Sequence, residues 1–66
     1  MPRGAVVEFD EAKGYGVIDD ASTGARYFFH CTQIADGTRS IAVGAEVDFD
    51  VAAGRLGRWE AVALRP

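Results

Sequence analysis

Short runs of apolar residues alternate with clusters of glycine, aspartate and serine along the whole chain. No long stretch combines a helical hydrophobic period with an absence of turn signals. The clearest strand pattern lies at residues 45–51, where Val47, Phe49 and Val51 alternate with acidic residues. Side chains of a strand alternate between its two faces, so these three are predicted to face a core and the acids to face solvent. The pattern predicts an all-β domain.

Five such runs predict five strands, near residues 4–10, 15–19, 25–31, 45–52 and 58–65. Two close hairpins and one longer connection, with at most one helical turn, are typical of a five-stranded antiparallel Greek-key barrel of the OB type. An SH3-like barrel has a similar number of strands and is the alternative. The side chains expected in the core are those of Val6, Ile18, Phe29, Val47, Phe49 and Val51.

The length of 66 residues is room for a single domain, residues 1–66. A domain of this size buries only about 60% of its unfolded surface, so a ligand is expected to bind on its outside. The one cysteine allows no intrachain disulfide. With no apparent signal peptide and no apolar run of membrane-spanning length, we expect a cytoplasmic protein without membrane contact.

The net charge of −3 argues against a protein that binds phosphates by bulk charge. It does not exclude nucleic acid, because single strands are also bound by stacking of bases on aromatic rings. Residues 13–18 fit this mode: glycines flank Tyr15, which shares the face opposite Ile18 with Val17, and Lys13 stands where it could meet a phosphate. The structural alternative is that the glycines only let a barrel strand bend sharply.

Residues 25–31 form the most aromatic segment of the chain. Alternation divides its side chains between two faces, one with Arg26, Phe28 and His30 and the other with Tyr27, Phe29 and Cys31. One face must fill the core. The other then exposes a ring beside an imidazole and a guanidinium, which is a surface suited to stacking bases. The alternative is that all the rings are core residues.

These two segments resemble the two nucleic-acid motifs of the bacterial cold-shock domain, Lys-Gly-Phe-Gly-Phe-Ile and Val-Phe-Val-His-Phe. The resemblance covers nearly the whole chain, with further matches at Gly4, Val6, Phe9, Ile34, Gly37, Gly44, Val47, Phe49, Gly54, Gly57 and Ala61. It implies a barrel that binds single-stranded RNA or DNA with low sequence preference, as an RNA chaperone or a regulator of transcription or translation. Such a protein needs no cofactor.

The departures from the family pattern concern stacking rings. Glu8 stands where the family has tryptophan, and Val17, Cys31 and Thr38 replace family aromatics. Because each stacked base contributes about 1–3 kcal/mol, such losses imply weaker binding by several orders of magnitude. The alternative function is therefore a cold-shock fold that has lost most nucleic-acid affinity and serves as a protein-interaction module.

Other residues could compensate for the missing rings. Arg26 shares a face with Phe28, and in the family fold Arg39, Arg55 and Arg58 would border that face. Trp59 is either a relocated stacking ring or a core residue aligned with Ala61 and Ala63. The predicted binding residues are Phe9, Lys13, Tyr15, Val17, Arg26, Phe28, His30, Arg39, Arg58 and Trp59.

Catalysis finds little support in the sequence. His30 and Cys31 are neighbours on a predicted strand, so their side chains are expected to point to opposite faces and to form no dyad. One histidine and one cysteine cannot make a structural zinc site. Asp19 and Asp20 are read as a solvated turn rather than a cation site. We therefore expect a binding protein and not an enzyme, with no metal.

Overall fold

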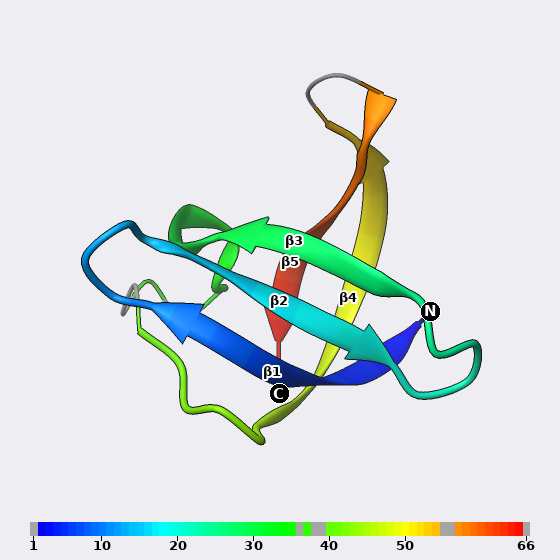
Figure 1. The fold of residues 1–66 in the computed structure, drawn as a ribbon, viewed down its shortest axis with the longest axis horizontal. Coiled ribbons are helices and arrows are strands. Elements are labelled where there is room, and N and C mark those ends of the chain that lie inside the picture. The colour runs from blue at the N-terminus through cyan, green and yellow to red at the C-terminus, as the bar shows by residue number, and fades with distance from the viewer. Residues whose placement is uncertain (1, 36, 38–39, 55–56, 66) are drawn as a thin grey trace.

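Five strands form a closed barrel in the computed structural model, which describes residues 2–35, 37, 40–54 and 57–65 (Figure 1). They are β1 (Arg3–Asp10), β2 (Tyr15–Asp20), β3 (Arg26–His30), β4 (Glu46–Ala53) and β5 (Trp59–Arg65), arranged in the order β1-β2-β3-β5-β4. One turn of 3-10 helix, η1 (Cys31–Gln33), follows β3. The predicted all-β barrel of the OB type is confirmed. Within the described ranges, no helix is long and apolar enough to cross a membrane.

The barrel closes through one parallel pair of strands, a detail that the predicted antiparallel Greek-key barrel did not include. β3 and β5 run parallel and meet at the pair Phe28↔Glu60, whereas the other neighbouring strands are antiparallel. The reason is topological. When an odd number of strands closes into a ring, their directions cannot alternate all the way round, so at least one neighbouring pair must be parallel.

The core contains five of the six side chains that alternation predicted, namely Val6, Ile18, Phe29, Val47 and Phe49. Ile34, Ala61 and Leu64 complete it. The Phe29 ring lies parallel to that of Phe9, with 5.9 Å between centroids and 5° between planes. A side chain on the buried Gly16 would collide with this core, because its Cβ would lie 2.7 Å from Cζ of Phe29. Gly16 therefore serves core packing.

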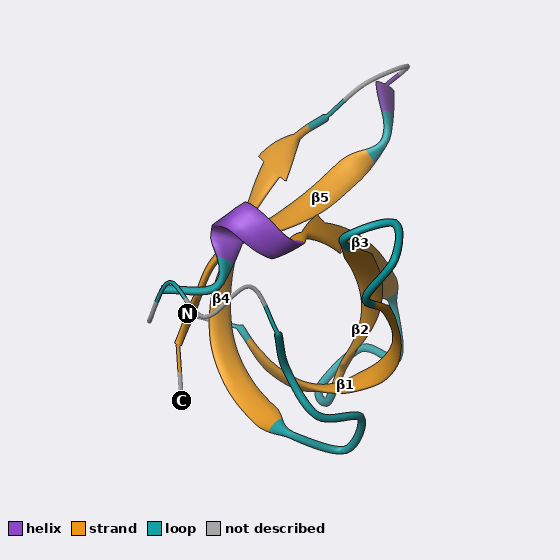
Figure 2. Cartoon of the chain, turned by 90° about the vertical axis from the view of Figure 1, so that its left-hand side faces the viewer, coloured by secondary structure: helices purple, strands orange, loops and turns teal. Residues whose placement is uncertain are grey.

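The prediction that Val51 is buried is wrong. This residue is 37% exposed, although its cross-strand partner Ala61 is fully buried. The β4–β5 hairpin continues past the body of the barrel, as both views show (Figures 1 and 2). Burial alternates along β4 only as far as Phe49, so the core ends before the strand does.

A bulge in β5 overturns the alternation expected near the C-terminus. The register steps from Asp48↔Arg65 to Asp50↔Val62, so β5 has one residue more than β4 between these pairs. Ala63 takes up the extra length in the left-handed region, with φ of 54°. As a result Leu64 enters the core and Ala63 is exposed. An extra residue reverses which face the following side chains occupy.

Asp20 closes β2 and organises the turn after it. Its carboxylate accepts hydrogen bonds from the backbone N–H of Ser22 (2.8 Å), the Ser22 hydroxyl (2.8 Å) and the backbone N–H of Thr23 (3.3 Å). These bonds, the Ser22 backbone N–H foremost, favour the charged form and lower the pKa of Asp20 below its ordinary value of 3.8. Asp20 thus holds the turn together, but it is the last residue of β2 and is buried, so the solvated-turn interpretation is wrong for this side chain.

Asp20→Asn should lower the stability of the protein at neutral pH, since the amide removes the charge that the three donors stabilise. Because the folded-state pKa is depressed, the stabilisation is complete above pH 3.8 and is lost as pH falls through the lower folded-state value. The difference between parent and variant in free energy of unfolding should therefore shrink below pH 3.8, as chemical denaturation at several pH values would measure. A difference that is the same at acid and neutral pH would contradict this role.

Candidate nucleic-acid interface

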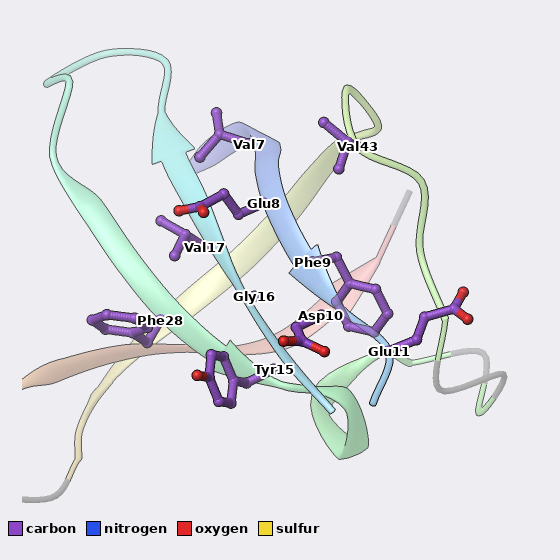
Figure 3. Close-up of a pocket in the computed structure, with 10 residues that line it drawn as sticks. All are labelled: Val7, Glu8, Phe9, Asp10, Glu11, Tyr15, Gly16, Val17, Phe28 and Val43. Carbon is purple, nitrogen blue, oxygen red and sulfur yellow. The ribbon is translucent and has the colours of Figure 1, made fainter. Parts of the chain in front are cut away.

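The strand register places two rows of side chains on the outer face of β1, β2 and β3. One row runs across the pairs Glu8↔Val17 and Val17↔Phe28. Directly opposed residues of an antiparallel sheet project to the same face, so each row is continuous. Figure 3 shows the Glu8, Val17 and Phe28 side chains in this succession. The second row consists of Asp10, Tyr15 and His30.

A bulge in β1 decides which side chains of that strand join the outer face. The register shifts between Val6↔Ile18 and Glu8↔Val17, so that Val6 faces the core and Glu8 faces out. Phe9 then lies on the inner side, half-buried and stacked on Phe29. Figure 3 shows its ring across the strand from Glu8. Phe9 therefore borders the outer face and is not a free ring on it.

On β2 and β3, the exposed rings are those that alternation assigned to the outer face. Tyr15 is 41% and Phe28 is 44% exposed, while Phe29 is buried. His30, opposite Tyr15 in the register, is also exposed. The prediction that one face of residues 25–31 fills the core and the other exposes a ring beside an imidazole is confirmed.

His30 also begins η1, as its N-cap. Its Nδ1 accepts a hydrogen bond from the backbone N–H of Thr32 (3.3 Å) and lies 3.0 Å from the Thr32 hydroxyl. Because Nδ1 is the acceptor, we assign the proton of the neutral ring to Nε2. The imidazole is thus held in a fixed orientation, with its Nε2–H available as a donor.

The geometric reason given against a His30–Cys31 dyad is wrong. β3 ends at His30, and η1 begins at Cys31, so strand alternation does not apply between them. Cys31 Sγ lies 3.9 Å from His30 Nδ1. Nδ1 is already the acceptor of the Thr32 N–H, and the thiol packs against the core. The proximity follows from the cap geometry.

The predicted cationic residues occupy different places. Arg26 faces outward and lies 3.8 Å from Asp19, measured from Nε to Oδ1. Arg58 places its guanidinium carbon 5.8 Å from the centroid of the Phe28 ring. Lys13 is exposed in the β1–β2 turn, where its backbone N–H donates to Asp10 Oδ1. Arg39, Arg55 and Thr38 lie outside the described residues.

Two hollows lie on the outer face, and they differ in charge. The acidic hollow, of about 740 Å³, has three carboxylates, from Glu8, Asp10 and Glu11, among the rings and apolar side chains in its wall (Figure 3). The platform hollow, of about 430 Å³, lies between Tyr15, Phe28, His30, Arg58 and Glu60. Sequence reasoning noted Glu8 alone. The acids on both sides of Phe9 were a signal that the charge extends further.

The barrel and its ringed outer face define a small OB-type binding domain. Residues 2–66 match the family described as the 'Cold-shock' DNA-binding domain. The chain therefore belongs to the cold-shock domain family, whose members generally bind nucleic acid.

Relatives of known name agree with this assignment. The chain is 38% identical to Cold shock-like protein CspD of Escherichia coli over 65 residues, covering 97% of this chain and 88% of the relative. It is 40% identical to Cold shock protein CspB of Geobacillus stearothermophilus over 58 residues, 86% of each chain. It spans only 31% of Cold shock domain-containing protein 4 of Arabidopsis thaliana, at 38% identity over 94% of this chain.

The fold matches a solved structure as well. The structure of Drosophila Unr CSD456 superposes with a TM-score of 0.78 and 28% identity over 96% of this chain and 25% of that one. The similarity to a cold-shock domain structure supports the OB-type barrel over the SH3-like alternative.

If His30 caps η1, the substitutions His30→Ala and His30→Asn should differ in their effect on stability. His30→Ala removes the acceptor of the Thr32 N–H and should lower the free energy of unfolding by about 1 kcal/mol. His30→Asn removes the ring but keeps a side-chain acceptor suited to an N-cap, so its stability should stay close to that of the parent. Chemical denaturation of the three proteins measures this. Equal destabilisation by both substitutions would show that the cap contributes nothing.

Proposed function

We propose that the chain binds single-stranded RNA or DNA with low sequence preference and acts as an RNA chaperone or a regulator of transcription or translation. The observation that carries the proposal is the adjacency of two exposed rings, Tyr15 and Phe28, on a face that also presents the His30 imidazole. Every base has a π-face, so stacking on such rings tolerates any sequence.

The rings supply most of the binding energy in this proposal. Bases stack on Tyr15, Phe28 and His30. Val17 adds an apolar contact on β2 beside Phe28, and Phe9 borders the surface. Lys13, Arg26, Arg39 and Arg58 contact phosphates, which contribute little each in an acidic protein.

Phe28→Ala should weaken binding of oligothymidine by about 1–3 kcal/mol, or roughly 5- to 150-fold, through loss of one stacking contact. Because Phe28 is 44% exposed, the variant should remain folded. Titration followed by the fluorescence of Trp59, the one tryptophan of the chain, measures the affinity.

Val51→Ala is the matched control for that experiment. Val51 is also an exposed apolar residue, and it lines neither hollow of the outer face. Its substitution should leave the affinity unchanged. If a folded Phe28→Ala protein binds oligothymidine as well as the parent does, the stacking mechanism is wrong.

A second candidate function is binding of a basic peptide segment of a partner protein. The acidic hollow favours it: three carboxylates share its wall with Phe9, Tyr15 and Phe28, and no lysine, arginine or histidine is among the described residues that line it. Carboxylates attract an arginine or lysine side chain, and aromatic faces add cation–π attraction. The same charges repel phosphates from this part of the face.

Glu8→Gln should weaken binding of a hexapeptide of alternating glycine and arginine by up to about fivefold, the effect of one exposed ion pair. Glu46→Gln is the control, since Glu46 is an exposed acid of β4 that does not line the hollow. Calorimetric titration at low salt gives both affinities. No detectable binding of the peptide to the parent protein would eliminate this candidate.

A further inference from the structure

Arg58 stands between two ring-walled spaces that meet at Phe28. On one side is the platform hollow. On the other is a hollow of about 390 Å³, here called the edge hollow, whose wall includes Arg26, Tyr27, Phe28, Arg58 and Trp59. Phe28 and Arg58 line both spaces. The guanidinium carbon of Arg58 is 5.8 Å from the centroid of Phe28, so this cation adjoins the ring that lines both spaces.

Trp59 offers a large free ring to the edge hollow. It is 60% exposed, the largest exposed aromatic fraction among the described residues. It begins β5 and pairs with Ala53 in the part of the hairpin that extends beyond the barrel (Figure 2). Core packing therefore does not account for this side chain. Bases stack on exposed tryptophan as they do on phenylalanine.

Charge favours the edge hollow over the acidic hollow for a phosphate. Two guanidinium groups, of Arg26 and Arg58, line the edge hollow, and no described carboxylate does. Arg26 is near Asp19, but the pair is long at 3.8 Å and exposed. Exposed pairs of this kind contribute little, so Arg26 can exchange its partner for a phosphate. Three carboxylates oppose a phosphate on the β1 side.

We propose that the edge hollow is a nucleotide-binding subsite. A bound single strand runs from Phe28 on β3 toward Trp59 on β5, and not from Phe28 over β2 toward β1. One base stacks on Phe28 and the next on Trp59. The phosphate that links them contacts Arg58, and Arg26 contacts the same backbone. This inference rests on the proposed function and specifies the path of its ligand.

The test compares the two directions with one short ligand, tetrathymidylate. The oligonucleotide carries a fluorescent label at one end, and the anisotropy of the label measures its affinity for each variant. Trp59→Ala should weaken binding roughly tenfold, the loss of one stacked base. Trp59→Phe keeps a ring and should restore most of the affinity. Glu8→Gln, on the β1 side, should change it less than about twofold, because the strand avoids that side.

The salt dependence gives an independent readout. Arg26→Gln should make the slope of log affinity against log salt shallower by about 0.7, the contribution of one single-strand phosphate. Arg3→Gln is the matched control: Arg3 is also exposed and paired with an aspartate, Asp48, and it lines none of these hollows. Its slope should equal that of the parent.

The outcomes separate the two proposals. If the parent binds no oligonucleotide, both the proposed function and this path are wrong. If Phe28→Ala weakens binding but folded Trp59→Ala does not, the function stands and the edge subsite is wrong. A gain of affinity in Glu8→Gln together with no effect of Trp59→Ala would place the strand on the β1 side. Circular dichroism and thermal melting establish that each variant is folded.

Discussion

The Phe29 ring, packed into the space beside Gly16, sets the orientation of the strands that carry the outer face. β2 and β3 are paired at Gly16↔Phe29, and the ring reaches beneath β2 only because position 16 has no side chain. With Phe29 fixed inward, strand alternation leaves Phe28 and His30 no choice but to face outward. The same pairing sets Tyr15 beside His30. A core contact thereby determines the chemistry of the surface.

Alternation along single strands was sufficient to predict much of this arrangement. It separated Phe28 from Phe29, and it assigned Val47 and Phe49 to the core. It failed at Val51 because a periodic pattern does not record where a hairpin leaves the barrel that covers it. It also failed after Val62, because a bulge residue has no sequence signal as strong as glycine: Ala63 carries the positive φ there.

Contacts between distant segments were beyond such reasoning. The position of Arg58 over Phe28 depends on the pairing of β3 with β5. In the sequence these two strands are separated by η1, the connection that follows it and β4. The approach of Cys31 to its sequence neighbour His30 was missed for a different reason, because the strand ends one residue earlier than predicted. The acidic hollow likewise gathers residues of β1 with Val43 of the distant connection. Composition indicated an acidic protein, but only the fold shows that Glu8, Asp10 and Glu11 share one hollow with exposed rings.

The parallel closure between β3 and β5 has a consequence for the dynamics of the barrel. Its register in the described strands consists of Phe28↔Glu60, whereas the antiparallel neighbours share several pairs each. This short boundary, which the isolated parallel bridge Ile34↔Leu64 extends, should open at a lower free energy than the antiparallel pairs, so amide hydrogen exchange should be faster along it than along those pairs. Phe28 lies on that boundary. Any molecule that binds to both β3 and β5 at this boundary raises the free energy of opening. Binding at the surface then protects the whole small barrel from opening.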